Sequence, residues 1–112
     1  MTLSAAMITV DCAEPQELAR WWAAALDAEI VQDFGEFVAV GAEPVTLGFQ
    51  RVPEDRQGKN RVHVDFASQS RPDEVDRLVG MGATVVSEHS VPGLAWTVLR
   101  DPNTRDYQFC AA

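Results

Sequence analysis

The alternation of apolar and polar residues along the chain predicts a series of short β-strands. Within residues 61–67, for example, the apolar Val64 lies between the polar His63 and Asp65. A period of two residues is typical of a strand that has one face against a core. This pattern predicts strands over Met7–Asp11, Ala28–Gln32, Phe37–Val40, Val45–Val52, Arg61–Ala67, Ala83–Val86, Ala95–Leu99 and Asp106–Cys110.

Two segments between these strands carry the signals of a helix start. Pro15 stands at the beginning of the first segment, with acidic residues beside it. The second begins with Ser70, which can cap a helix, and continues with a proline and two acids. These residue types favour the first turn of a helix. We therefore expect helices from Pro15 to about Leu26 and from Ser70 to about Gly80–Gly82.

The predicted elements repeat. The order strand–helix–strand–strand–strand occurs twice, on either side of a polar, breaker-rich linker over residues 53–60. The repeat matches Val10-Asp11 with Val64-Asp65, Ala28–Val31 with Ala83–Val86, Phe37–Val40 with Trp96–Leu99 and Leu47–Phe49 with Tyr107–Phe109. An internal repeat constrains the fold strongly. We predict one α+β domain over residues 1–112, in which two βαβββ modules (4–52 and 61–112) form curved mixed sheets around a central pocket.

Composition excludes several classes of partner. The chain has 112 residues, of which 46% are hydrophobic and 23% charged, and its net charge is −8. Such an acidic balance disfavours binding to nucleic acid and to anionic membranes. No apolar run approaches the ~20 residues of a membrane span, and we expect that the first residues do not act as a signal peptide. Cys12 and Cys110 lack metal-site spacing, so we expect reduced thiols and a cytoplasmic protein, with a Cys12–Cys110 disulfide as the less favoured alternative.

Several segments together resemble those of a known family: Ile8–Pro15, Leu18–Trp22, Gly48–Glu54, Gly58–Asp65 and Trp96–Pro102. They are similar to the vicinal oxygen chelate superfamily, and within it to the glyoxalase-like branch that includes bleomycin resistance proteins and dioxygenases. The resemblance covers nearly the whole chain. The superfamily contains metal-dependent lyases, isomerases and dioxygenases, but also metal-free proteins that sequester antibiotics. It implies a small-molecule ligand and a homodimer, because small members often pair modules between chains.

In metal-using members of this superfamily, the ligands come from the first and last strands of each module. The resemblance places these ligand positions at Thr9 (Met7 if the register is offset), Gly48, His63 and Gln108. Only His63 and Gln108 are plausible ligands, whereas a catalytic divalent ion generally needs three protein ligands and an open position. We therefore expect no complete metal site and no cofactor. A site rebuilt from His63, Asp65 and Gln108 is the alternative.

The remaining candidates are polar or aromatic residues on inward strand faces. We expect the ligand to contact His63, Asp65, Gln50, Gln108, Trp96 and Thr9. For each residue a structural role competes with binding. Asp11 and Asp65 can accept backbone bonds where a strand leads into its helix, and Trp96 can pack on the sheet. His89 lies in a polar stretch before a turn, where we expect it to be exposed, and no nucleophile triad is recognisable.

These observations favour a small-molecule-binding protein without a complete catalytic metal site. The alternative is a lyase, isomerase or dioxygenase that uses a divalent metal, or His63 with Asp65 as acid and base. A third hypothesis is a structural or regulatory dimer whose pocket is vestigial. The sequence identifies no catalytic residue, so it leaves open whether the protein is an enzyme.

Overall fold

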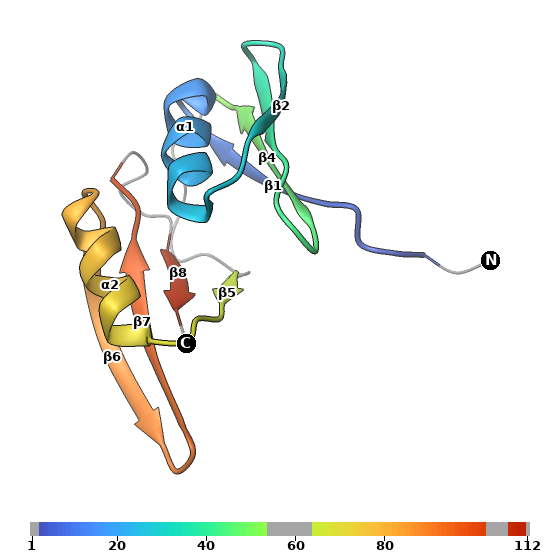
Figure 1. Ribbon diagram of the computed structural model, residues 1–112. Helices are drawn as coiled ribbons and strands as arrows, with labels where there is room; N and C mark the ends of the chain where they lie inside the picture. The colour runs from blue at the N-terminus through green and yellow to red at the C-terminus, as the bar shows by residue number, and fades with distance from the viewer. Residues whose placement is uncertain (1–2, 54–63, 103–107, 112) are drawn as a thin grey trace. The chain divides into compact units, whose positions relative to one another are not determined.

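The computed structural model describes residues 3–53 and 64–102 in full and the backbone of residues 108–111. The chain divides into two compact units, Met1–Asp55 and Arg56–Ala112, called unit one and unit two below. Both units have the predicted order strand–helix–strand–strand–strand (Figure 1). The α+β class and the two βαβββ units with mixed sheets are therefore confirmed.

Unit one contains one helix and a four-stranded sheet. Its elements are β1 (Met7–Cys12), α1 (Pro15–Leu26), β2 (Ile30–Asp33), β3 (Phe37–Val40) and β4 (Thr46–Arg51). The strands lie in the order β1-β4-β3-β2. The first and last strands are parallel neighbours, while β2, β3 and β4 pair in antiparallel fashion. Residues about forty positions apart, such as Thr9 and Gly48, therefore lie opposite each other.

Unit two repeats this topology. Its elements are β5 (Asp65–Phe66), α2 (Arg71–Gly80), β6 (Thr84–Val91), β7 (Leu94–Arg100) and β8 (Gln108–Ala111). The strand order is β5-β8-β7-β6, and again the first and last strands are parallel. No helix in the described part of the chain is long and apolar enough to cross a membrane.

The core of unit one lies between α1 and one face of its sheet (Figure 1). The helix contributes Leu18, Ala19 and Trp22, each at most 2% exposed. Alternate residues of the strands meet it, namely Val10, Cys12, Val38, Val40, Leu47 and Phe49. Removing this apolar surface from water is the main stabilising contribution of the unit. Cys12 is a buried thiol within this core.

The opposite face of the sheet in unit one carries the other alternate residues. We call this the open face of unit one; it consists of Met7, Thr9, Asp11, Phe37, Ala39, Thr46, Gly48 and Gln50. Gly48 is buried on this face although it has no side chain. A Cβ atom at Gly48 would lie 2.8 Å from Met7 Sδ and 2.8 Å from Phe37 Cζ. The side chains of Met7 and Phe37 therefore fill the space in front of Gly48.

Unit two has the same two-faced arrangement. Thr97 and Leu99 of β7 are fully buried, and Thr97 Oγ1 accepts a hydrogen bond of 2.6 Å from Arg71 Nη1 of α2. Thr97 and Leu99 therefore mark the helix-facing side. The open face of unit two carries the alternate positions, which are Asp65, Ser87, His89, Trp96, Val98 and Arg100.

Three predictions about elements need correction. The strand expected over Ala83–Val86 is much longer, because the polar residues up to Val91 pair with β7. Polar residues extend a strand when a neighbouring backbone offers hydrogen bonds, which the local pattern cannot reveal. The last strand extends to Ala111, one residue beyond the expected end at Cys110, and the expected start at Asp106 lies outside the described residues. In unit two, only Asp65 and Phe66 form the strand expected over Arg61–Ala67, since Val64 lies outside it and residues 61–63 lie outside the described residues.

The predicted alignment of β3 with β7 in the repeat is also wrong, by two residues. Phe37 pairs with Gln50, whereas Val98 pairs with Cys110. Gln50 and Cys110 are equivalent because their parallel partners are Asp11 and Asp65. The counterpart of Phe37 is therefore Val98, not Trp96. The same register makes Ala39, which pairs with Gly48, the counterpart of Arg100, which pairs with Gln108.

A polar contact joins β2 to the first turn of α1. Gln16 Nε2 donates to both carboxylate oxygens of Asp33, at 2.9 and 3.2 Å. The backbone N–H of Gly35 donates to the same carboxylate at 2.9 Å. The hydrogen bond from Gln16, followed by that from Gly35, lowers the pKa of Asp33 below its ordinary value. These bonds favour the charged form of the carboxylate.

We predict opposite effects for two glycine substitutions. Gly48→Ala should lower the free energy of unfolding by about 1–3 kcal/mol, since the new methyl group meets Met7 and Phe37. Gly80→Ala is the control, because Gly80 ends α2 and has no neighbour within 4 Å of its added Cβ. That change should raise stability by roughly 0.4–1 kcal/mol. Urea unfolding of both variants measures the two changes in the free energy of unfolding. Equal changes would contradict the close approach of Met7 and Phe37 to Gly48.

We also predict an acid-dependent contribution from Asp33. Its folded pKa is lowered, so the stabilisation is present above the unfolded pKa and is lost as the pH falls through the folded value. Gln16→Ala should raise the pKa of Asp33 toward its ordinary value, as followed by NMR titration of the carboxyl carbon. Gln32→Ala changes a neighbouring exposed amide and serves as the control, for which the pKa of Asp33 should not change.

Candidate functional site

The polar candidates of unit one lie on its open face. Thr9 and Asp11 of β1 are exposed, and Gln50 of β4 is half-buried. The register places Asp11 beside Gln50 and Thr9 beside Gly48. Side chains at paired positions of neighbouring strands point to the same side of the sheet. The structure therefore brings Thr9, Asp11 and Gln50 together on one surface.

The position of Gly48 bears on metal binding in unit one. Of the two positions in this unit where the family resemblance leads us to expect ligands, Thr9 supplies a neutral hydroxyl and Gly48 supplies no side chain. Met7 and Phe37 occupy the space that a ligand side chain at Gly48 would need. Divalent ions in catalytic sites are held by nitrogen, carboxylate or thiolate groups. The donor set of unit one at these positions therefore does not fit such an ion.

In unit two the structure places Asp65 and Trp96 on the same open face but on different strands. Asp65 is exposed on β5 and pairs with Cys110 of β8. Trp96 is half-buried on β7. His63 lies outside the described residues, and of Gln108 only the backbone is described, in register with Arg100. The ligand-contacting roles of His63, Gln108 and the other candidates therefore remain predictions.

Trp96 has a partner that the sequence did not reveal. The His89 ring stacks on the Trp96 ring, with centroids 5.2 Å apart and planes 15° from parallel. The two residues are directly opposite in the β6–β7 ladder. His89 Nε2 also lies 2.8 Å from Ser87 Oγ. His89 is exposed as expected, but it belongs to a strand and to an aromatic pair.

Sequence signals for this cluster were weak. Ser87 and His89 are two residues apart, which fits one strand face, but the stretch lacks the apolar residues that mark a strand. Only the pairing of β6 with β7 puts His89 opposite Trp96. Cross-strand pairs of this kind depend on register, which local sequence specifies poorly.

Two arginines of unit two are half-buried and differ in their partners. Arg71 Nη1 lies 2.6 Å from Thr97 Oγ1 and 3.9 Å from Glu88 Oε1. The Nε atom of Arg100 is buried and donates no hydrogen bond to any described residue. Arg100 lies on the open face, in the β7 position that follows Leu99.

Among the described residues, no group of three or more His, Cys, Asp or Glu side chains is arranged to hold a metal ion. This finding does not extend to His63, so it leaves the predicted absence of a metal untested. The described open faces carry hydroxyl, carboxylate, amide, imidazole and indole groups. Such groups can hydrogen-bond and stack against a small molecule.

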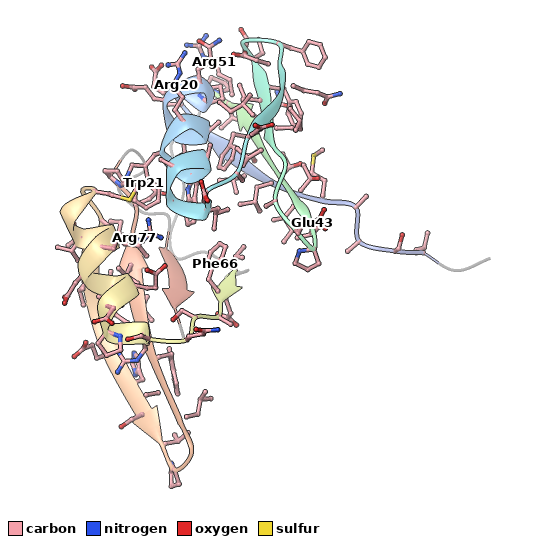
Figure 2. All side chains as sticks on the ribbon, in the orientation of Figure 1. Arg20, Trp21, Glu43, Arg51, Phe66 and Arg77 are labelled. Carbon is pink, nitrogen blue, oxygen red and sulfur yellow. The ribbon has the colours of Figure 1, made fainter. Side chains whose placement is uncertain are left out.

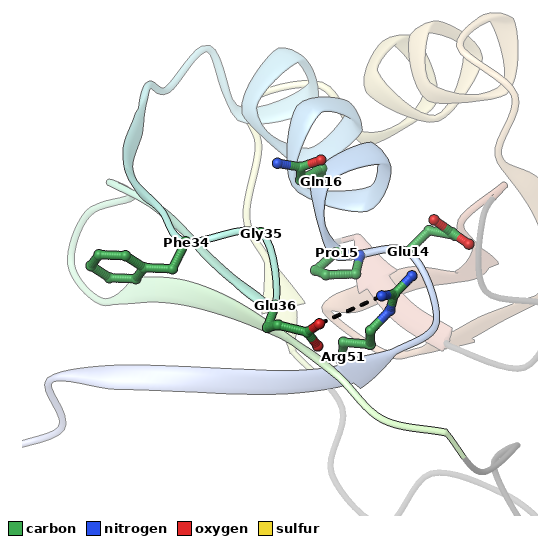
Figure 3. A pocket seen from close by; sticks show the side chains of 7 residues that line it. All are labelled: Glu14, Pro15, Gln16, Phe34, Gly35, Glu36 and Arg51. Carbon is green, nitrogen blue, oxygen red and sulfur yellow. Dashed lines mark ion pairs between the residues drawn. The ribbon is translucent and has the colours of Figure 1, made fainter.

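A separate pocket of about 250 Å³ lies at the start of α1 in unit one (Figure 3). Its lining consists of Glu14, Pro15, Gln16, Phe34, Gly35, Glu36 and Arg51. Arg51 is engaged within it, since its Nη1 atom lies 3.6 Å from Glu36 Oε1 and its Nε donates to Ala13 O at 3.3 Å. None of the predicted site residues lines this pocket, and its cation already has a carboxylate partner. We therefore do not regard it as the functional site.

Solved structures share this fold at low sequence identity. A FosX fosfomycin resistance protein variant from Listeria monocytogenes, complexed with Mn(II) and 1S,2S-dihydroxypropylphosphonic acid, has 14% identity and a TM-score of 0.80 over 99% of this chain and 89% of its own. FosX from Mesorhizobium loti has 12% identity and a TM-score of 0.75, over 99% and 91%. A glyoxalase/bleomycin resistance protein/dioxygenase family enzyme from Burkholderia phytofirmans has 13% identity and a TM-score of 0.74, over 95% and 96%.

Comparison with curated protein sequences finds no match. The model of the glyoxalase-like domain family, in contrast, matches residues 7–111. That range includes every strand and both helices of the two βαβββ units. The chain belongs to the glyoxalase-like domain family, within the vicinal oxygen chelate superfamily.

Proposed function

We propose that this protein binds a small molecule on the open faces of its sheets and has no complete catalytic metal site. The observation that carries the proposal is the environment of Gly48. At a ligand position of the superfamily this residue has no donor, and Met7 and Phe37 fill the adjacent space. A site of this kind is unable to hold an ion by the usual set of ligands.

The ligand contacts that we propose are the polar and aromatic residues of the open faces. Thr9, Gln50 and Asp65 supply hydrogen-bonding groups, and Trp96 supplies an apolar ring that His89 already orients. His63 and Gln108 complete the proposed set. Hydrogen-bonding side chains and an accessible aromatic ring are groups that can recognise a partly apolar ligand.

The rival proposal is an enzyme, a lyase, isomerase or dioxygenase. One of the similar structures, FosX from Listeria monocytogenes, was solved with Mn(II) and a dihydroxypropylphosphonic acid. In this chain an ion would depend on His63, Asp65 and Gln108 in unit two. Such an ion would polarise a carbonyl or enolate oxygen of the substrate.

We also propose a cytoplasmic homodimer. Apolar side chains lie exposed on the outer strands of both sheets, with Val31 57% exposed on β2 and Val91 51% exposed on β6. Exposed apolar residues on a sheet edge favour association with another chain. A second copy of this chain would cover them.

We predict that the protein, purified without chelator and titrated with Mn²⁺, Co²⁺, Ni²⁺ or Zn²⁺, binds no stoichiometric metal. Isothermal titration calorimetry and metal analysis measure this directly. His63→Ala and Asp65→Asn are the informative variants, and His89→Ala, which removes the other histidine, is the matched control. Tight binding of one ion per chain that His63→Ala abolishes and His89→Ala preserves would establish the rival proposal instead.

We further predict that chelator-treated protein is stabilised by compounds from a library of antibiotics and oxoacids. Ligand binding raises the unfolding temperature because the ligand binds only the folded state. Trp96→Ala should abolish the shift, whereas Trp21→Ala on α1 should preserve it. If no compound raises the unfolding temperature, the binding function fails. The hypothesis of a structural or regulatory dimer with a vestigial pocket is then favoured.

A further inference from the structure

Arg100 has an environment that the described part of the chain does not explain. Its Nε atom is buried and donates no hydrogen bond to a described residue, although the chain contains 17 acidic residues. Buried polar groups almost always have a partner, because leaving a donor unpaired away from water costs free energy. Arg71 in the same unit follows this rule, since its Nη1 donates to Thr97 Oγ1 and forms an ion pair with Glu88 at 3.9 Å.

The repeat shows that the βαβββ unit has no need for an arginine at this position. Ala39 is the counterpart of Arg100 in unit one, and it is only 1% exposed. The two positions have equivalent places in their strands, so a methyl group satisfies the packing in one unit. The βαβββ topology therefore does not by itself require a long cationic side chain at this position.

We propose that Arg100 binds the acid group of a small ligand on the open face of unit two. The acid is a carboxylate, phosphate or phosphonate, since a guanidinium group pairs with these oxyanions through two parallel hydrogen bonds. The inference rests on the proposed function, because it names the ligand class for the same face. An acidic protein does not attract anions as a whole, so a local cation must supply the attraction.

The neighbours of Arg100 along β7 define the rest of the ligand. Val98 is the next residue on the open face, roughly 6–7 Å along the strand, and Trp96 follows at the same interval. Both are apolar, and Trp96 is held by its stack with His89. Val98 is buried, at 8% exposed, whereas Trp96 is half-buried, so the ligand is an acid with an apolar or aromatic body that reaches from Arg100 toward Trp96.

The first test is the stability of the full-length protein without ligand. Arg100→Met should raise the unfolding temperature, because it keeps most of the apolar stem and removes the buried unpaired donor. Arg77→Met is the matched control (Figure 2): Arg77 lies on α2, and its Nη2 atom is 3.0 Å from Glu74 Oε1. The control should leave the unfolding temperature unchanged or slightly lower it. A lower unfolding temperature for Arg100→Met would make Arg100 a structural residue and overturn the proposal.

The second test measures by calorimetry the binding of two acids, phenylphosphonate and benzoate. Benzyl alcohol is the uncharged counterpart. The two acids should bind the wild-type protein, and Arg100→Met should weaken their binding by roughly tenfold to a hundredfold. Arg100→Lys keeps the charge but loses the paired geometry, so binding should weaken by a smaller factor. Arg77→Met should bind the acids as the wild type does. Equal affinity of the wild type and Arg100→Met would overturn the proposal.

The same measurements distinguish failure of this inference from failure of the proposed function. If uncharged compounds bind in a way that depends on Trp96 while the acids do not bind, the binding function stands and the role of Arg100 fails. If no compound of either kind binds, both fail. If Arg100→Met does not fold, Arg100 is structural, and the proposal fails in that case too.

Discussion

The parallel pairing of the first and last strands is the interaction on which each unit depends. It joins residues about forty positions apart in unit one, and it makes β4 and β8 inner strands of their sheets. A parallel pair needs a crossover connection, which α1 and α2 with the intervening strands provide. Because the helix covers one face of each sheet, the other face is left to carry the polar side chains.

The two units share this topology but carry different side chains on the open face. In unit one, Met7 and Phe37 fill the space in front of Gly48, so part of the open face is occupied by the protein's own side chains. In unit two the equivalent β7 position is Arg100, and Trp96 stacks with His89 further along the strand. Unit two therefore has the more distinctive recognition groups, although its sheet has the same topology.

The family resemblance and the described geometry bear on different questions. The match over residues 7–111 and the structural similarity to FosX proteins establish the family and the fold. Activity within this superfamily depends on a few side chains at fixed strand positions, since one fold supports many functions. Thr9 and Gly48, at two of the positions where the family resemblance leads us to expect ligands, offer neither a carboxylate nor an imidazole.

The sequence by itself determined the order of elements, the internal repeat and the family. Alternating apolar residues and a proline at a helix start reflect conformational preferences of a few neighbouring residues. These elements can therefore be predicted from the sequence without the tertiary structure. Tertiary structure decided what depends on register between distant strands: the extension of β6 through Ser87 and His89, the equivalence of Phe37 with Val98, and the burial of Arg100 Nε. The physical reason is that backbone hydrogen bonds between strands are available to polar and apolar residues alike. Which side chains meet across a sheet therefore becomes fixed only when the strands have paired.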